Sequence, residues 1–333
     1  MPALPPIPGL READPLTNET VFQLARRPAS LVIIGGGAIG CELGQAFARL
    51  GIRVTILEAA PRVLASEEPD ASALITDVLC GEGVDVRVGV TIASAAREPN
   101  GETRLILGGG TTVSAEQLLV AAGRRPVTDG LDLHDHGVKI DQHGAIKTNE
   151  HLATTKAGIY AAGDVTGRLQ LTHAANRMGI IAATNVLRHF PKSKFDTATI
   201  PTVVFTDPQI ARVGITEAQA PTTRARVAEL PMTEFERAII EQRTEGFVKL
   251  IAGPRQLLGS LAGGRLLGAT IVAPGAGEII HEAALAIQTR MFTGRLAQNV
   301  HAYPTWSIAI QQAAAQFFFE YGGRTARPAR PHH

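Results

Sequence analysis

A glycine-rich turn between a strand and a helix is the feature that most constrains this chain. Residues 30–37, SLVIIGGG, read as a buried strand running into glycines, and AIGCELGQAFARLG then places apolar residues at helical spacing. Gly-x-Gly-x-x-Gly in this context predicts a dinucleotide-binding βαβ unit, because its glycines permit the turn, the approach of a pyrophosphate and close helix–strand packing. The N–H groups at the helix start attract phosphate. The residues expected at the cofactor are Gly35, Gly36, Gly37, Ala38, Ile39 and Gly40.

An acidic residue closes the next predicted strand. IRVTILEAA, residues 52–60, reads as a strand that ends near Glu58. A carboxylate there accepts hydrogen bonds from the adenosine ribose and repels a 2′-phosphate, so it favours NADH over NADPH. Arg62 lies a turn further on and keeps NADPH open as an alternative. The other interpretation of the glycines is a structural turn without a ligand.

The order of elements around this turn predicts an α/β fold. DASALITDVLCGEG reads as a second helix and VDVRVGVTIASAA as a returning strand, which gives a βαβαβ order and a parallel sheet with right-handed crossovers. TRLILGGG and TTVSAEQLLVAAG add short strands of an antiparallel meander near the end of this domain. The fold class predicted is α/β, a Rossmann-like NAD(P)-binding fold followed by a C-terminal α+β domain.

The rest of the chain divides into regions that differ in their content of predicted loops, strands and helices. A loop-rich stretch carries one helix, AANRMGIIAATNVL, and a later region mixes strands such as GFVKLIAG with apolar helices such as AGEIIHEAALAIQTRM. GPRQLLGSLAGGRLLG reads as an extended hairpin loop. The predicted divisions are a lead-in segment at 1–28, an NAD(P)-binding domain at 29–124, a central segment at 125–196, a C-terminal domain of mixed strands and helices at 197–320 and a disordered, Arg- and Pro-rich tail at 321–333.

Composition narrows the class of partner. A net charge of +1 gives no reason to expect nucleic acid or an acidic membrane, and no apolar run approaches the length of a membrane span. With no secretory signal visible in MPALPPIPGL, the expected location is the cytoplasm. Cys41 and Cys80 do not form a disulfide framework, and no metal site is predicted. Cys41 lies in the first turn of a helix, where the dipole lowers a thiol's pKa, so a redox role stands beside the commoner role of core filler.

The order of motifs resembles one enzyme family. VIIGGGAIGCELGQAFARLG, VTILEAAPRVL, LLVAAGRRPVT, TNEHLATTKAGIYAAGDV and TVVFTDPQIARVGITEAQA together look like the pyridine nucleotide–disulfide oxidoreductases, the group containing dihydrolipoamide dehydrogenase, glutathione reductase and mercuric reductase. The resemblance implies an FAD/NAD(P)-binding fold, with the second FAD motif in the central segment at 125–196 and a dimerisation domain at 197–320. It places Asp164 at the ribityl chain of FAD. On the residues alone, Asp164 is equally a turn or cap residue. The other positions that the resemblance places at the cofactors are Gly123, Leu171, Thr172 and His173.

The same resemblance implies an FAD subdomain that this sequence does not show. The family begins with another Rossmann unit, which holds the ADP part of FAD and carries two redox cysteines. This sequence has one Gly-x-Gly-x-x-Gly turn, and its opening PPIPGL resembles the segment that follows the missing unit. The chain is therefore expected to be a truncation, an internal-start product, or one half of a split protein whose other half is a separate chain.

The C-terminal motif departs from the family pattern. Where dehydrogenase and glutathione-reductase members have H-x-H-P-T-x-x-E, this chain has HAYPTWSI, with Tyr303 in place of the catalytic histidine and Ile308 in place of the glutamate. Tyrosine titrates near 10 and is a poor base for thiols, although its hydroxyl can donate a hydrogen bond or ligate a soft metal ion. A tyrosine in this region points to the mercuric-reductase branch, whose paired C-terminal cysteines are absent here. Tyr303 and His301 are weak catalytic candidates, and His301 is more simply a structural residue.

Three functions follow from these expectations. The leading one is a homodimeric flavoprotein that passes hydride from NADH through FAD to a disulfide or a metal ion, with this chain catalytically incomplete. The second is a non-catalytic NAD(H)-binding dimer that serves as a sensor or scaffold. The third is one half of a split flavoenzyme. Trp306 and the FFF at 317–319 are expected in the dimer interface or the core.

Overall fold

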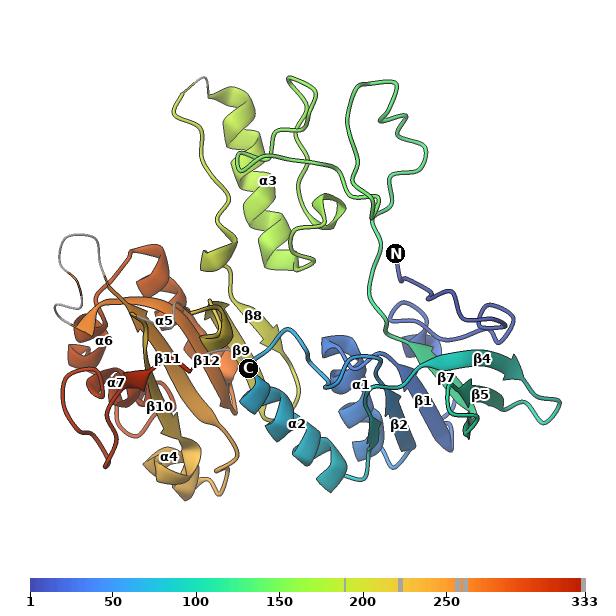
Figure 1. Cartoon of the computed structure of the whole chain (residues 1–333), viewed down its shortest axis with the longest axis horizontal. Helices are drawn as coiled ribbons and strands as arrows, with labels where there is room; N and C mark the ends of the chain where they lie inside the picture. Colours follow the sequence, from blue (N-terminus) through green and yellow to red (C-terminus); the bar gives the residue numbers. More distant parts are fainter. Residues whose placement is uncertain (189, 221–223, 255–258, 260–262, 331–333) are drawn as a thin grey trace. The chain divides into compact units, whose positions relative to one another are not determined.

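The computed structural model describes residues 1–188, 190–220, 224–254, 259 and 263–330, and it divides into two compact units (Figure 1). The smaller unit combines residues 1–3 with 123–200, and the larger combines 4–122 with 201–333. None of the helices within the described residues has the length and apolar character that a membrane crossing requires.

A parallel sheet forms the first part of the larger unit. Its four strands run in the order β3-β2-β1-β7, as expected for a Rossmann-like fold. On β1, Leu31 and Ile33 pack in one cluster with the helices, whereas Val32 and Ile34 pack in another with the meander, so this strand is buried on both faces. The elements are β1 (Ser30–Ile34), α1 (Ala38–Arg49), β2 (Arg53–Leu57), α2 (Pro69–Gly81), β3 (Asp85–Arg87) and β7 (Gln117–Val120).

The predicted meander is a separate antiparallel sheet in the order β4-β5-β6. Its strands are β4 (Ile92–Arg97), β5 (Thr103–Leu107) and β6 (Thr112–Ala115), and the chain leaves it to enter the parallel sheet as β7. The lead-in packs against these sheets: Leu10 and Ala13 are buried with the meander, Leu16 bridges Leu119, and η1 (Val21–Gln23) follows.

A six-stranded antiparallel sheet forms the second part of the larger unit, in the order β13-β10-β11-β12-β9-β8. Helix α5 packs on β9 and β12, and α7 packs on β10 and β11. Within the predicted hairpin loop, residues 255–258 and 260–262 lie outside the described part of the chain, and residues 265–268 belong to β12. The elements are β8 (Thr202–Val204), β9 (Gln209–Gly214), η4 (Glu217–Gln219), β10 (Arg226–Pro231), η5 (Met232–Glu234), α4 (Glu236–Ile240), β11 (Phe247–Gly253), β12 (Arg265–Ala273), α5 (Ala276–Gln288), α6 (Thr293–Gln298), α7 (Ile308–Ala315) and β13 (Arg327–Pro328).

The predicted disordered tail is instead packed as far as Arg330. Strand β13 pairs with β10, and Ala329 is 5% exposed. Arg327 forms an ion pair with Glu217, and Arg324 pairs with Glu234. The prediction was wrong here because the arginines that suggested solvation have carboxylate partners elsewhere in the domain. Residues 331–333 lie outside the described part of the chain.

The two parts of the larger unit share a core. Val204, Ile210 and Phe247 from the C-terminal region belong to the same buried cluster as the parallel sheet, α1 and α2. Gln45 on α1 donates to Asp207 O at 2.8 Å and accepts from Asp207 N at 2.7 Å. These contacts fix the helix that follows the glycine turn to the C-terminal region.

The smaller unit is loop-rich, as the sequence predicts. Helix α3 (Thr172–Leu187) is its main regular element, with η2 (Asp164–Thr166) before it and η3 (Thr197–Thr199) after it. Its core contains Leu152, Met178 and Phe195.

Candidate cofactor-binding sites

The glycine turn has the shape that a dinucleotide requires. Gly35 has φ +109°, and a Cβ there would lie 2.5 Å from Ala121 O. A Cβ at Gly40 would lie 1.9 Å from Gly35 O, so both glycines are required by packing. A Cβ at Gly37 would meet nothing within 4 Å. The backbone at Gly37 therefore borders open space, which leaves it accessible to a ligand.

The start of α1 faces this space with no side chain capping it. Gly37 is the N-cap residue, with extended backbone and no side-chain hydrogen bond to the first turn. The first turn, Ala38–Gly40, carries N–H groups at the positive end of the helix dipole. This arrangement fits an anionic ligand at the residues that the sequence predicted.

Glu58 lies directly at the glycine turn. Gly36 N donates to Glu58 Oε2 at 2.6 Å, and Ala60 N donates to Glu58 Oε1 at 2.7 Å. The side chain is only partly buried, and each carboxylate oxygen can accept a further hydrogen bond. Glu58 is therefore held where it can accept ribose hydroxyls.

Arg62 is turned into its own loop. Its Nη1 donates to Leu64 O at 3.2 Å, and its Nη2 donates to Ala65 O at 2.7 Å and to Glu67 O at 3.0 Å. The guanidinium thus donates to three backbone carbonyls of its own loop. An arginine that binds a phosphate would direct these N–H groups to the ligand instead.

Cys41 does not have the environment of a reactive thiol. It is fully buried in the core beneath α1, and its Sγ lies 3.4 Å from Gly36 O. Burial, reinforced by the charges of Glu58 and Glu42, raises the pKa of the Cys41 thiol to about 12. The expected lowering by the helix dipole is therefore overridden, and Cys41 is a core residue. Cys80 is exposed on the last turn of α2.

In the smaller unit, Asp164 sits in a tight turn of glycines. Gly163 precedes it with φ +82° and Gly167 follows with φ +66°. Asp164 Oδ2 lies 2.9 Å from Arg124 Nη1, and both side chains are more than one third exposed. Gly163 N also donates to the buried Met178 Sδ at 3.3 Å, which ties the turn to α3. The carboxylate is therefore fixed in direction but accessible, which fits a hydroxyl-rich ligand.

The start of α3 holds the other residues that the resemblance assigned to FAD. Leu171 is the N-cap, and Thr172 and His173 form the first turn, with no side chain making a cap hydrogen bond. Gly123 has φ +110° and open space at its missing Cβ. These positions have room for a ligand.

His301 pairs with a residue that the sequence did not reveal. Its Nε2 lies 2.9 Å from Glu282 Oε2 on α5, and its Nδ1 lies 3.1 Å from Asn299 O. The side chain is only 6% exposed, and Asn299 Nδ2 donates to the same carboxylate at 3.0 Å. Both ring nitrogens are therefore engaged within the domain, which supports the structural role.

Tyr303 is 68% exposed, and its hydroxyl donates to Glu236 Oε2 at 2.7 Å. That hydrogen bond and the charge of Glu236 raise the pKa of Tyr303, so even less of its side chain is present at neutral pH as the phenolate, the form that could act as a base. Ile308 begins α7 and packs against the core, as does Trp306, whose ring lies 5.8 Å from that of Phe235. Phe317 is buried, whereas Phe318 and Phe319 are exposed.

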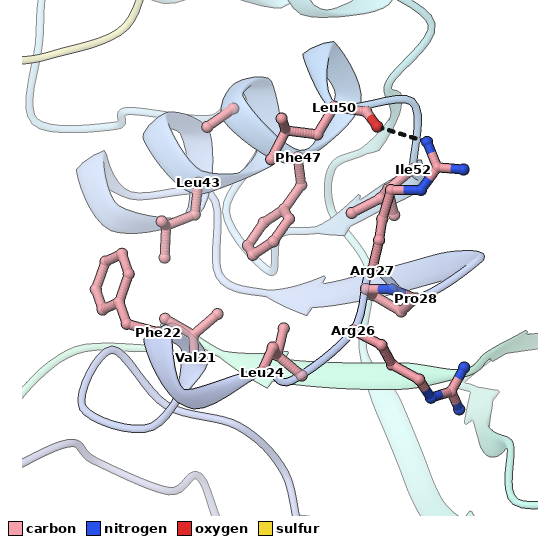
Figure 2. Close-up of a pocket in the computed structure, with 11 residues that line it drawn as sticks. Val21, Phe22, Leu24, Arg26, Arg27, Pro28, Leu43, Phe47, Leu50 and Ile52 are labelled. Atoms are coloured by element: carbon pink, nitrogen blue, oxygen red, sulfur yellow. Dashed lines mark hydrogen bonds between the residues drawn. The ribbon is translucent and has the colours of Figure 1, made fainter.

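An apolar pocket of about 370 Å³ lies on the far part of α1 (Figure 2). Leu43, Phe47 and Leu50 of α1 face Val21 and Leu24 across it. Arg27 Nη1 closes one end by donating to Leu50 O at 2.9 Å. None of the glycine-turn residues lines this pocket, so it is separate from the candidate dinucleotide site.

Comparison with known families decides the assignment. Residues 1–179 match the pyridine nucleotide-disulphide oxidoreductase family, and residues 200–314 match the dimerisation domain of the same family. The first match covers more than half of the sequence. The chain belongs to this family. Pyridine nucleotide-disulphide oxidoreductases use FAD and NAD(P)H, as the resemblance predicted.

Individual relatives within the family fall into two groups. The chain is 36% identical to mercuric reductase of Bacillus cereus over 324 residues, which are 94% of this chain and 49% of that protein. It is 35% identical to dihydrolipoyl dehydrogenase of Thermus scotoductus over 293 residues, which are 86% of this chain and 61% of that protein. It spans from 49% to 66% of the mercuric reductases to which it is similar.

Solved structures of family members share the fold. RclA of Escherichia coli, a HOCl-induced flavoprotein disulfide reductase solved as a Cu(II) complex, has a TM-score of 0.84 and 29% identity, over 95% of this chain and 70% of that one. LpdA of Mycobacterium tuberculosis has a TM-score of 0.82 and 30% identity, over 91% of this chain and 65% of that one.

Several partners of the candidate site residues had no signal in the sequence. Glu282, Glu236 and Arg124 are the partners of His301, Tyr303 and Asp164, and each is one of many charged residues on a helix or loop. Glu67 and Arg212 lie 145 residues apart in sequence and form a hydrogen-bonded ion pair. A pattern with a fixed local spacing does not reach contacts of this kind.

Proposed function

We propose that this chain carries the NADH site, part of the flavin site and the dimerisation surface of an NADH-dependent flavin oxidoreductase of the mercuric-reductase-like branch. The observation that carries the proposal is the glycine turn, where open space at Gly37 adjoins a carboxylate, Glu58, held by Gly36 N. Both features suit a dinucleotide with a free ribose 2′-hydroxyl.

In this proposal, the residues of the chain bind and orient the two cofactors. The first turn of α1 holds the pyrophosphate, Glu58 accepts the ribose hydroxyls, and Asp164 accepts from the ribityl chain with Arg124 fixing its direction. A flavin held there would supply the redox chemistry, which is hydride transfer from the nicotinamide and electron transfer to an acceptor.

The acceptor proposed is a disulfide or a soft metal ion. Tyr303 stands where dehydrogenase members have a catalytic histidine, and its hydrogen bond to Glu236 disfavours the phenolate. A phenol in this state donates a hydrogen bond rather than removing a thiol proton. This substitution, together with similarity to mercuric reductases, supports the mercuric-reductase-like branch.

The test of the proposed function is the choice of nucleotide. NADH is expected to bind more tightly than NADPH by about 1–3 kcal/mol, because the Glu58 carboxylate would face a 2′-phosphate without a matching donor. Calorimetric titration of the chain with each nucleotide measures the difference. Glu58→Gln is expected to reduce the difference in binding free energy between NADH and NADPH, since the amide keeps the size of the side chain and removes its charge. Equal or tighter binding of NADPH to the wild-type chain contradicts the assignment.

The isolated chain is expected to hold FAD weakly. Asp164 offers contacts to the ribityl part, but the one glycine-rich turn of this sequence is assigned to the nicotinamide dinucleotide. Each missing charge-assisted hydrogen bond to the ADP part costs roughly 1.5–3 kcal/mol. The chain should therefore purify without stoichiometric flavin absorbance. Flavin that survives dialysis, and is released by Asp164→Ala, would show that this sequence completes an FAD site alone.

Absorbance alone does not separate the alternatives, because a colourless chain that binds NADH is expected both of the incomplete flavoenzyme and of a non-catalytic NAD(H)-binding dimer, which the burial of Cys41 favours for this chain by itself. Recovery of bound flavin on adding a separate polypeptide would favour a split flavoenzyme.

A homodimer is expected through the C-terminal region, in keeping with its match to the dimerisation domain. Exposed apolar side chains lie here, among them Ile240 at 62%, Val300 at 91% and Phe318 at 44%. Phe318→Glu is expected to produce monomers in light scattering, because a charge placed in an apolar interface is left without a partner. Phe22→Glu is the matched control, since Phe22 is 79% exposed on η1. A stable dimer of the Phe318 variant would place the interface elsewhere.

A further inference from the structure

Residues 58–70, here called the 58–70 loop, connect β2 to the start of α2 and return to the glycine turn. Gly36 N donates to Glu58 Oε2 at 2.6 Å, and Leu64 N donates to Gly36 O at 2.8 Å. Arg62 lies between these two attachment points. Its guanidinium therefore belongs to a stretch of chain bound at both ends to the turn where the dinucleotide is placed.

The conformation of the loop keeps Arg62 away from that turn. Arg62 donates to the carbonyls of Leu64, Ala65 and Glu67, all on the side leading to α2. Leu64 has φ +49°, a left-handed conformation that non-glycine residues adopt at a cost. Such a conformation persists where the surrounding contacts impose it. The hydrogen bonds of Leu64 itself are to Gly36, Glu67 and Arg62, and Glu67 is in turn held by the C-terminal region.

Glu67 joins Arg62 to that region. Its main-chain carbonyl accepts from Arg62, and its N–H donates to Leu64 O at 2.9 Å. Its carboxylate accepts from Arg212 on β9, at 2.8 Å to Nε and 3.3 Å to Nη2. The pair is well enclosed, with 6% exposure for Glu67 and 17% for Arg212. A two-point contact of this kind fixes direction as well as distance.

A second anchor follows at the start of α2. Lys249 Nζ on β11 lies 2.7 Å from Asp70 Oδ2 and 3.7 Å from Glu68 Oε2. Glu217 N donates to Glu68 Oε1 at 2.6 Å. The end of the loop is thereby held by two elements of the C-terminal region, and the Glu67–Arg212 pair lies nearest to Arg62 in sequence.

We propose that the Glu67–Arg212 pair determines nucleotide choice by holding Arg62 against its own loop. The inference rests on the proposed NADH site. Glu58 disfavours a 2′-phosphate, and the pair keeps the nearby cation from compensating for it. Glu67 and Arg212 are positioning residues in this scheme, because neither touches the nucleotide. Released from the carbonyls, Arg62 has donors that suit the 2′-phosphate of NADPH.

The variant that tests the proposal is Glu67→Gln with Arg212→Met. Removing both charges avoids leaving one of them buried without a partner. The ratio of the NADPH to the NADH dissociation constant, measured by calorimetry, is expected to fall about tenfold, the effect of one charge-assisted hydrogen bond. Adding Arg62→Met should restore the wild-type ratio. Glu234→Gln is the control, because it breaks another two-point pair, with Arg324, in the same region.

A second measurement follows the chemical accessibility of the Arg62 guanidinium and needs no nucleotide. An arginine-selective dicarbonyl reagent is expected to label Arg62 several-fold faster in the double variant, with the exposed Arg53 as the internal reference. Failure of both nucleotides to bind the wild-type chain would overturn the proposed NADH site, while faster labelling would still support the hold on Arg62. An unchanged ratio of dissociation constants, or a shift that persists in the Arg62→Met background, would overturn the role in nucleotide choice.

Discussion

Replacing Gly37 with valine is expected to abolish NADH binding and to leave the fold intact. Gly37 has φ −75° and extended backbone, which valine adopts without strain, and a Cβ there meets nothing within 4 Å. The side chain would instead fill the space assigned to the pyrophosphate. Loss of its charge-assisted contacts, at roughly 1.5–3 kcal/mol each, should weaken binding by at least about a hundredfold. Calorimetry measures the affinity, and the unfolding temperature measures the fold.

Gly40→Ala is the matched control for a purely structural loss. Alanine within a helix normally stabilises it by about 1 kcal/mol relative to glycine. Here the new Cβ would lie 1.9 Å from Gly35 O, so the unfolding temperature is expected to fall. Wild-type affinity for NADH in the Gly37→Val chain would place the nucleotide elsewhere. A parallel loss of stability in that chain would show that Gly37, like Gly40, is required by packing.

The glycine turn and Glu58 could be predicted because their requirements are local. The strand, the turn and the helix start follow one another in sequence, so spacing alone brings Gly35, Gly37 and Gly40 together. The hydrogen-bond partners of Arg62 could not be predicted from its local sequence. Its position four residues after Glu58 suggested a phosphate ligand, but its hydrogen bonds are set by the fold of the 58–70 loop and by Arg212, far along the chain.

Cys41 and the C-terminal tail show the same limit, although the favoured core role of Cys41 agrees with its burial and the predicted disorder of the tail was wrong. The helix dipole at Cys41 is visible in the sequence, but its burial depends on the strands and helices that surround it, and burial has the larger effect on the pKa. The tail was predicted to be disordered from its content of arginine and proline. Arg327 instead pairs with Glu217, which is 110 residues away, and composition carries no information about that distance.

A buried ionic cluster holds the nucleotide-binding part to the C-terminal sheet. Lys249 is 1% exposed, with Asp70 at 2.7 Å, Glu217 at 3.4 Å and Glu68 at 3.7 Å. Burial opposes the charge on Lys249, but the hydrogen bond to Asp70 and the charge of Glu68 outweigh it and raise the pKa. Burial likewise opposes the charge on Glu217, but hydrogen bonds from Arg327 and from Arg330 N lower its pKa to about 2.

The depressed pKa of Glu217 sets the direction of one pH dependence. A carboxylate with a lower pKa in the folded state contributes stability that is fully present above its unfolded value, here 4.5, and is lost as the pH falls toward about 2. Acid should therefore weaken the attachment between α2 and the C-terminal sheet, which Glu217 shares with Lys249.

Lys249→Met is expected to lower the free energy of unfolding by about 3–5 kcal/mol, because it leaves the buried carboxylate of Glu68 without its cation. Methionine keeps most of the side-chain volume, so the loss reports charge rather than a cavity. The loss should shrink at acidic pH, since burial raises the pKa of Glu68 and its protonation removes one uncompensated charge.

Lys194→Met is the control, because Lys194 and its partner Glu150 are 62% and 53% exposed, and such pairs contribute about 1 kcal/mol or less. Urea unfolding of both variants at neutral and acidic pH measures the difference. An unfolding midpoint of Lys249→Met equal to that of the wild-type chain would mean that the carboxylates around Lys249 reach solvent once it is gone, and that the shared apolar core holds the two parts together by itself.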